Sequence, residues 1–319
     1  MKLGIIILVG SEHGTPIGNW AAGKVPLECL EILGKSMLER QIERFMESDP
    51  AVITVLVKSG TRIPVNSCPV PENVKIRRAD DLWFATSMAL REYCEIGVQQ
   101  TIIANADTYT ECDILDLVYF HQESRRVVTG TSDSVGPLGL WVADCDKARV
   151  EPLDFLLGPP RLESSSYFVW NYTHRLKTLA DVRKLVVDSL QRRCAVRPAA
   201  PEVRPGVFIA EGAQVHKRAR IVAPAFVGRD SRIREDALIT RCSNIESDCY
   251  IDCSTAVEDS SILSNTYVGL CLDVAHSVVQ GDLLLNVQRN VELRIVDANV
   301  VRENVFGQSA AVEAAAPLS

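Results

Sequence analysis

The C-terminal third of the chain carries a branched aliphatic residue at every sixth position. The members of this run are Ile209, Val215, Ile221, Val227, Ile233, Ile239, Ile245, Ile251, Val257 and Leu263. A small residue stands two positions before nearly all of them, as at Ala213, Ala219 and Ala225. An α-helix repeats at about 3.6 residues and a strand at 2, so neither explains this spacing. A hexapeptide β-helix does, because three short strands build one triangular coil and stacked coils share a core. The pattern predicts a left-handed parallel β-helix over residues 206–302.

The first half of the chain alternates segments typical of strands and of helices. Strands are expected at 3–9, 51–57 and 101–104, with shorter ones at 127–130 and 138–142. Helices are expected after the capping box at Ser36–Glu39, over 80–95 and over 113–124. This order predicts an α/β fold in which helices cover a mostly parallel sheet. Ligands bind such sheets at the carboxyl ends of the strands. We therefore expect the loop from Gly10 to Thr15 and Asp107 to face one crevice.

Boundaries follow from breaks in these patterns. The α/β domain is expected over residues 1–196, including a loop at 152–166 and an amphipathic helix after Thr178. Three prolines between Arg197 and Pro205 indicate a linker. The six-residue phase slips near Asn265, and Val268 and Val274 restart it. Residues 282–301 alternate like strands that cap the last coil, and an Ala-rich tail over 303–319 is expected to be disordered.

Composition and charge restrict the class of protein. The chain has 319 residues, of which 47% are hydrophobic and 24% charged, with a net charge of −7. It contains neither an apolar run of about 18 residues nor a signal-peptide pattern, so we expect a cytoplasmic protein without membrane contact. The acidic balance gives no reason to expect nucleic-acid binding. The ten cysteines form no C-x-x-C pair and are expected to be reduced thiols.

Residues 5–10 form an apolar strand that ends in glycine, and Gly14 and Thr15 follow in a loop. Together with the β-helix repeat, this segment resembles the first strand and glycine-rich loop of the sugar-nucleotide pyrophosphorylases, a family of sugar-1-phosphate nucleotidyltransferases that often carry a C-terminal β-helix. Residues 34–43 are similar to the start of its first long helix. Residues 85–87 fall where the family has Gly-Thr-Ala over the base, and residues 103–107 are similar to its strand ending in Gly-Asp. The resemblance covers most of the chain and implies a nucleotidyltransferase-like domain before the β-helix.

The resemblance also implies a site and its ligands. It makes Asp107 a catalytic residue that holds Mg²⁺, and Lys24 a replacement for the family's phosphate-binding lysine. The residues expected to bind the nucleotide and its phosphates are Gly10, Ser11, His13, Gly14, Thr15, Ala85 and Thr86. The expected substrates are a nucleoside triphosphate and a sugar 1-phosphate. Backbone N–H groups of a glycine-rich loop hold phosphate, and cations offset the charge that grows during transfer.

The chain departs from the family pattern at several of these positions. Pro16 follows Thr15 where the family has arginine, and we expect His13 to compensate. Ala85 and Ala106 stand where the family has glycine, and no Glu-Lys-Pro motif for the sugar phosphate follows. Two alternatives remain: a divergent nucleotidyltransferase with a rebuilt site, or a non-catalytic homologue that senses nucleotides or acts as a scaffold.

A third alternative comes from the β-helix. Hexapeptide β-helices also form acyltransferases, in which a histidine between neighbouring prisms deprotonates the acceptor. His216 and His276 are the candidates here, although the simpler expectation for each is an exposed or capping histidine. In all three alternatives we expect a homo-oligomer that assembles through the β-helix.

Overall fold

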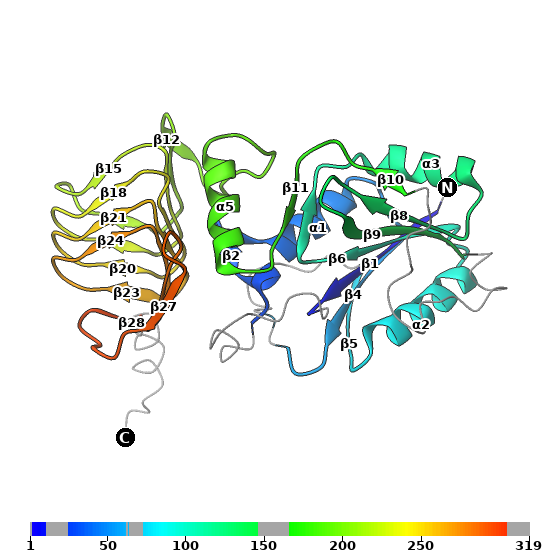
Figure 1. The fold of residues 1–319 in the computed structure, drawn as a ribbon, viewed down its shortest axis with the longest axis horizontal. Helices are drawn as coiled ribbons and strands as arrows, with labels where there is room; N and C mark the ends of the chain where they lie inside the picture. Colours follow the sequence, from blue (N-terminus) through cyan, green and yellow to red (C-terminus); the bar gives the residue numbers. More distant parts are fainter. Residues whose placement is uncertain (1, 11–24, 62, 64–72, 146–165, 305–319) are drawn as a thin grey trace, which may run out of the picture. The chain divides into compact units, whose positions relative to one another are not determined.

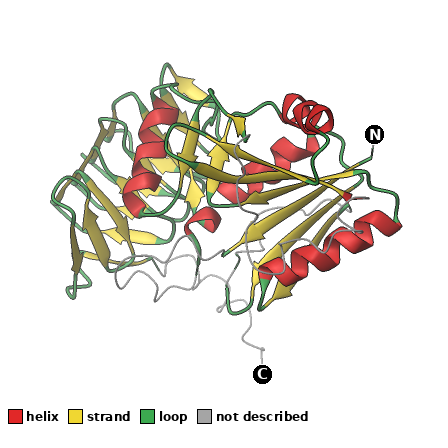
Figure 2. Ribbon diagram, turned by 45° about the vertical axis from the view of Figure 1, so that its right-hand side comes forward, coloured by secondary structure: helices red, strands yellow, loops and turns green. Residues whose placement is uncertain are grey.

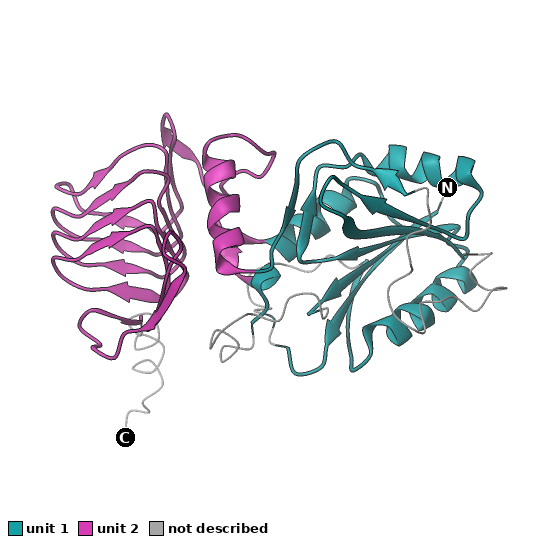
Figure 3. Cartoon of the chain, in the orientation of Figure 1, with its two compact units in different colours: residues 1–29, 37–177 teal, residues 30–36, 178–319 magenta. Residues whose placement is uncertain are grey.

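The protein is an α/β protein, described here by a computed structural model that covers residues 2–10, 25–61, 63, 73–145 and 166–304. The chain divides into two compact units, coloured separately in Figure 3. The first unit comprises residues 1–29 and 37–177, and the second comprises residues 30–36 and 178–319. The chain therefore enters the second unit for seven residues, returns to the first, and leaves it again after Lys177.

The first unit is built on a seven-stranded sheet rich in parallel pairs, with the order β10-β8-β9-β6-β1-β4-β5. Its strands are β1 (Leu3–Val9), β4 (Val52–Lys58), β5 (Val74–Ala79), β6 (Gln100–Asn105), β8 (Val128–Ser132), β9 (Pro137–Asp144) and β10 (Tyr167–Phe168). Strand β1 pairs in parallel with β4 on one side and β6 on the other. Strand β9 is antiparallel to both of its neighbours. The predicted strands at 3–9, 51–57 and 101–104 are confirmed as β1, β4 and β6.

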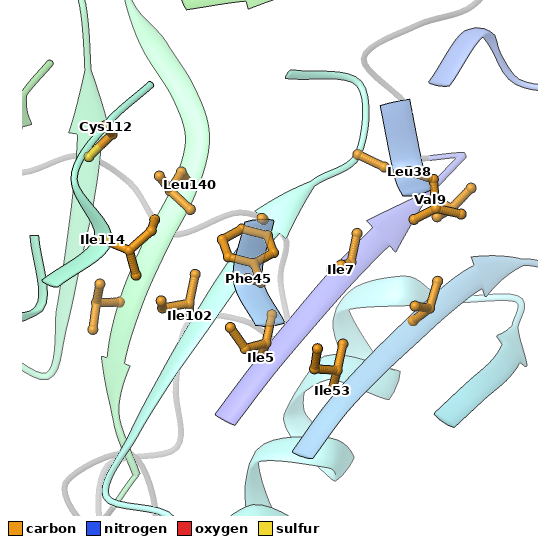
Figure 4. Close-up of a cluster of buried hydrophobic side chains, with 14 of the residues drawn as sticks. Ile5, Ile7, Val9, Leu38, Phe45, Ile53, Ile102, Cys112, Ile114 and Leu140 are labelled. Atoms are coloured by element: carbon orange, nitrogen blue, oxygen red, sulfur yellow. The ribbon is translucent and has the colours of Figure 1, made fainter. Parts of the chain in front are cut away.

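Helices cover both faces of this sheet (Figure 2). α1 (Met37–Met46) and α3 (Ile114–Ser124) pack on the face that carries Ile5, Ile7 and Val9. Figure 4 shows Leu38 and Phe45 beside these side chains, and Ile114 beside Leu140 and Ile102. α2 (Leu82–Glu95) packs on the opposite face, against Ile6 and Leu8. Strand β1 is buried on both faces, which is why its sequence is continuously apolar rather than alternating.

The second unit contains three sheets of short parallel strands, and consecutive strands join a different sheet each time (Figure 1). The strands are β13 (Val207–Ile209), β14 (Gln214–Val215), β15 (Arg220–Ile221), β16 (Ala225–Val227), β17 (Arg232–Ile233), β18 (Leu238–Thr240), β19 (Asn244–Ile245), β20 (Tyr250–Ile251), β21 (Ala256–Glu258), β22 (Ser261–Ile262), β23 (Thr266–Val268), β24 (Asp273–Ala275) and β25 (Ser277–Gln280). Each pairs in parallel with a strand three places before or after it in the chain, as β15 does with β18. The predicted aliphatics from Ile221 to Val257 are all buried in one common core.

The phase slip lies earlier than the sequence predicts. Val227 aligns with Ile245, a spacing of 18 residues, but Ile245 aligns with Ile262, a spacing of 17. Ile262 therefore takes the core position that the six-residue count assigned to Leu263. The repeat is one residue shorter here, and the shortening falls in the turn around Asp259, whose φ is 44°, and not near Asn265. Both Ile262 and Leu263 are apolar, so the sequence run hides the change. Val268 and Val274 do take up the shifted core positions.

Antiparallel strands lie at both ends of this unit. β12 (Glu202–Arg204) pairs with β13 and forms inside the predicted linker. At the other end, β26 (Leu283–Asn286) pairs with β25, β27 (Val291–Arg294) pairs with β26, and β28 (Val301–Glu303) pairs with β23. Asn304 donates hydrogen bonds to the carbonyls of Asn265 and Asp248, so residues 303–304 are ordered, contrary to the expected tail. The rest of that tail, and residues 152–165, lie outside the described residues.

Two further elements complete the second unit. α5 (Leu179–Leu190) begins with a capping box at Thr178 and contacts β25. Its buried Arg183 donates to the Cys242 carbonyl at 2.7 Å and to the Asp259 carboxylate at 2.7 Å. The hairpin of β2 (Glu31–Ile32) and β3 (Lys35–Ser36) turns at Leu33 and Gly34, whose amides donate to Glu246 at 2.7 and 2.9 Å. Residues 30–36 therefore group with strands that follow about two hundred positions later.

Two sequence expectations concern the whole chain. Among the residues that the structure describes, no helix is long and apolar enough to span a membrane. The described cysteines are all free thiols. Cys253 and Cys271, which lie on neighbouring parallel segments, are joined by a backbone hydrogen bond from the Cys271 amide to the Cys253 carbonyl.

Candidate functional site

The carboxyl end of β1 is fastened by a buried carboxylate. Gly10 follows β1 with φ of 76°, and its amide donates to Oε1 of Glu28 at 2.9 Å. Glu28 lies in a short 3-10 helix, η2 (Leu27–Cys29), and its side chain is buried. This role of Glu28 was not predicted from the sequence. The only sequence sign of this role is that Glu28 stands among the apolar residues Leu27, Cys29 and Leu30, where a side chain that faces solvent is not expected.

Asp107 lies at the carboxyl end of the neighbouring strand. The Ala106 amide donates to the Leu8 carbonyl at 2.9 Å, which extends the β1–β6 ladder by one residue and places Asp107 just beyond it. Asp107 is buried, and its Oδ1 accepts a hydrogen bond from the Thr108 hydroxyl at 3.0 Å. The methyl group of Ala106 is fully buried in the sheet core. The Ala106 side chain therefore adds to the core of the first unit.

Gln41 of α1 holds the backbone around Asp107. Its Nε2 donates to the carbonyls of Asn105 and Ala106 at 3.3 Å each, and to the Thr108 carbonyl at 2.7 Å. The Leu176 amide donates to the Asp107 carbonyl at 2.7 Å from the other side. The turn after β6 is thus fixed by side-chain and backbone hydrogen bonds. Gln41 was also missed, although its place three residues after Leu38 and four before Phe45 puts it on the apolar face of the helix, which is a sequence sign that it faces inward.

The pKa of Glu28 is raised by its surroundings. Burial raises the pKa of Glu28, the hydrogen bond from the Gly10 amide opposes this, and the nearby charge of Asp107 raises the pKa further. Two carboxylates at one end of a sheet therefore repel each other in a setting that water screens poorly. A proton or a cation bound by these carboxylates would offset the repulsion.

This pair fits Mg²⁺ by its chemistry. Mg²⁺ binds oxygen ligands, and in phosphate-transfer sites it takes one or two carboxylates, with waters and substrate phosphates supplying the rest. Asp107 and Glu28 provide two buried carboxylates, and a bound divalent cation would offset the repulsion between their charges. No group of three or more His, Cys, Asp or Glu side chains with metal-binding geometry is found in the part of the chain that the structure describes. A substrate would have to complete the coordination.

The other predicted site residues fall into two groups. Ser11, His13, Gly14, Thr15 and Lys24 lie outside the described residues, so their prediction stays a prediction. Ala85 and Thr86 lie in the first turns of α2. The Thr86 hydroxyl is fully buried and donates to the Leu82 carbonyl at 2.7 Å, and Ala85 packs against the core beneath α2. The described contacts of both are thus internal to α2 and its packing.

A second polar network lies after β8. Asp133 accepts hydrogen bonds from the Arg175 guanidinium at 2.9 Å, from the Thr173 hydroxyl at 2.6 Å and from two backbone amides. Burial alone would raise the pKa of Asp133, but these donors hold it well below its usual range. Arg175 belongs to β11 (Thr173–Arg175), which pairs with β7 (Thr108–Thr110) directly after Asp107. The network therefore anchors the strand beside the candidate site.

The two histidines of the second unit have separate surroundings. His276 Nδ1 lies 2.6 Å from Oδ2 of Asp259, whose other oxygen is bound by Arg183. His216 Nδ1 accepts from the Arg218 amide at 3.3 Å. The Asp259 carboxylate is therefore shared between a histidine and a buried arginine that fastens α5, which is a structural arrangement.

Comparisons with known proteins add no assignment to this geometry. No family model matches the chain, and a search of curated proteins finds no significant match.

Proposed function

We propose that this chain is a divergent sugar-1-phosphate nucleotidyltransferase, with an N-terminal nucleotide-binding unit and a C-terminal left-handed parallel β-helix. The observation that carries the proposal is the presence of two buried carboxylates at the carboxyl edge of the sheet: Asp107, which follows β6, and Glu28, which accepts the Gly10 amide just after β1. Ligands of parallel α/β sheets bind at this edge. The six-residue period and the three sheets of short parallel strands support the β-helix.

In this proposal Asp107 and Glu28 hold Mg²⁺ together with the phosphates of a nucleoside triphosphate. The ion, when bound, neutralises phosphate charge, which is the main obstacle to joining two phosphorylated substrates. Gln41 fixes the backbone that presents Asp107, and this preorganisation avoids the cost of ordering the ligand during the reaction. The loop that begins at Gly10 contributes backbone amides to the phosphates.

A thermal-shift titration tests the binding step. ATP, GTP, CTP and UTP are added with and without Mg²⁺ to the full chain and to Asp107→Asn. We expect a Mg²⁺-dependent rise in the melting temperature of the wild type that is absent in Asp107→Asn. A Glu47→Gln variant, altered in the loop after α1, serves as the control. A wild-type protein that no nucleotide stabilises in Mg²⁺ would refute nucleotide binding.

Pyrophosphate release then tests turnover. A coupled assay with a panel of sugar 1-phosphates and the stabilising nucleotide should release pyrophosphate with the wild type and not with Asp107→Asn. If the protein binds a nucleotide but releases pyrophosphate with none of the sugar 1-phosphates, nucleotidyl transfer is refuted and nucleotide binding remains.

One observation favours the second candidate function, a homologue that does not transfer nucleotides. The Glu28 carboxylate already accepts the Gly10 amide, the first N–H of the loop expected to hold phosphate. A carboxylate in this place would compete with a phosphate. The protein would then act through its second unit, as a scaffold or sensor.

Glu28→Gln distinguishes the two candidates because the expected effects are opposite. If Glu28 helps to hold Mg²⁺, the substitution weakens Mg²⁺-dependent nucleotide binding. If Glu28 excludes phosphate, the neutral side chain strengthens nucleotide binding and does so without Mg²⁺. Far-UV circular dichroism establishes that the variant is folded before its binding is measured.

A further inference from the structure

β27 is the last strand of an eight-stranded sheet and has one open edge. The sheet has the order β12-β13-β16-β19-β22-β25-β26-β27, and β27 pairs only with β26 among the described strands. All four of its residues are exposed, including Val291 at 43% and Leu293 at 52%. Val296, just beyond it, is 94% exposed. An open edge with apolar side chains is a template for another strand unless something covers it.

The hydrogen bonds of β27 show which residues face the open edge. The Ile295 amide donates to the Asp282 carbonyl at 2.7 Å, so Ile295 and every second residue before it direct their backbone groups toward β26. The backbone groups of Leu293 and Val291 therefore point toward β26. The N–H and C=O groups of Glu292 and Arg294 point to the open edge, because hydrogen-bonding direction alternates along an antiparallel strand.

We propose that this edge pairs with β27 of a second copy of the chain, antiparallel and centred on Leu293. In that register Glu292 stands opposite Arg294 of the second copy, and Arg294 stands opposite its Glu292. These are the residues whose backbone groups face outward, so each pair forms two backbone hydrogen bonds as well as an ion pair. Leu293 meets its own copy at the closely spaced, non-hydrogen-bonded position.

The charges favour this register over its neighbours. Pairing centred on Glu292 would place two carboxylates opposite each other, and pairing centred on Arg294 would place two guanidinium groups opposite each other. Like charges directly opposite destabilise a strand pair, whereas opposite charges stabilise it. Arg294 now lies 3.5 Å from the Asp282 carboxylate at an exposed site, a contact of little strength that leaves it able to reach Glu292 of the second copy.

The resulting dimer has two-fold symmetry and joins two eight-stranded sheets into one. A two-fold interface is self-complementary, because the same residues contribute from both copies. This dimer goes beyond the proposed function, since it depends only on the second unit and is independent of nucleotide binding.

Sedimentation velocity of the full chain at several concentrations tests the dimer. We expect a species of about 70 kDa, twice the 35.1 kDa of one chain. Glu292→Arg and Arg294→Glu each create like-charge pairs and should weaken the dimer at least about tenfold. The double variant with both changes restores opposite charges in swapped order and should dimerise like the wild type. Arg289→Glu, a charge change outside the strand, is the matched control.

Glu292→Pro provides a second test that does not depend on charge. Its amide faces the open edge, so proline removes an intermolecular hydrogen bond without breaking the β26–β27 ladder. We expect this variant to be folded and monomeric. A wild-type protein that is monomeric throughout, or an oligomer that neither the single charge reversals nor the proline weakens, would overturn the proposal. So would a double charge swap that fails to restore the dimer while both single variants are folded.

Discussion

Glu246 offers the most direct test of how the second unit is held together. Its side chain is completely buried, and its two oxygens accept from the amides of Leu33 and Gly34 and from Nδ2 of Asn244 at 2.7, 2.9 and 2.6 Å. Burial raises the pKa of Glu246 to about 7, and the nearby Glu31 carboxylate adds to the rise. The hydrogen bonds oppose this shift but do not cancel it.

The pKa difference sets the size of the pH effect. In the unfolded chain the ordinary value is 4.5, so the shift to about 7 corresponds to about 3 kcal/mol. Because the folded pKa is the higher one, the folded state binds the proton more tightly. The contribution is fully present below pH 4.5 and is lost as the pH rises through 7. Relative to a variant that cannot titrate at this position, the wild type should therefore lose about 3 kcal/mol of stability between these limits.

Glu246→Gln is that variant. Urea unfolding is followed at pH 4.5 to 8 by far-UV circular dichroism, because all four tryptophans precede residue 178 and fluorescence reports the first unit. The difference in unfolding free energy, wild type minus variant, should fall by about 3 kcal/mol over this range. Glu211→Gln, at an exposed position, should show no such trend. A difference that stays constant with pH, or that grows as the pH rises, would refute the reasoning.

Three further outcomes are expected. Arg183→Met should lower the free energy of unfolding by about 1–3 kcal/mol in urea, because it leaves the buried Cys242 carbonyl without its donor, whereas Asp259 keeps His276 as a partner; an unchanged free energy of unfolding would contradict this. Asp133→Asn should lower the melting temperature at pH 7, and the loss should shrink as the pH falls below 3.8, since the low folded pKa of Asp133 stabilises the fold only where the unfolded carboxyl is ionised; an equal loss at about pH 3 would contradict it. Gly228→Ala should cost about 1–3 kcal/mol, because a Cβ there would lie 2.5 Å from the Glu246 carbonyl carbon, which is backbone and cannot move aside; an unchanged unfolding midpoint would show that the coil shifts freely.

Much of the fold follows from periodicity. The aliphatics from Ile221 to Val257 are buried in one common core formed by short parallel strands, as their six-residue spacing predicts. The phase slip was predicted near Asn265 and not at Asp259 because Ile262 and Leu263 are equally apolar. A position count cannot tell which of two adjacent aliphatics faces the core, whereas strand pairing can.

The polar interior was harder to predict. Asp107 could be placed because it follows a buried apolar strand, a local signal. Glu28 and Glu246 are buried by residues far away in the sequence: Glu28 binds an amide 18 positions earlier and Glu246 an amide 213 positions earlier. A single sequence gives no sign of such partners, and a glutamate is assumed to be solvated unless its partner is known.

The seven-residue excursion at 30–36 has a consequence for how this protein is made. A ribosome releases that hairpin early, yet the carboxylate that receives its turn is translated more than two hundred residues later. The growing chain must keep the segment accessible until the far end emerges, so the two halves cannot mature strictly one after the other. A chain that ends after Lys177 would leave the amides of Leu33 and Gly34 without their acceptor. The complementary fragment would bury the Glu246 carboxyl group without these two donors.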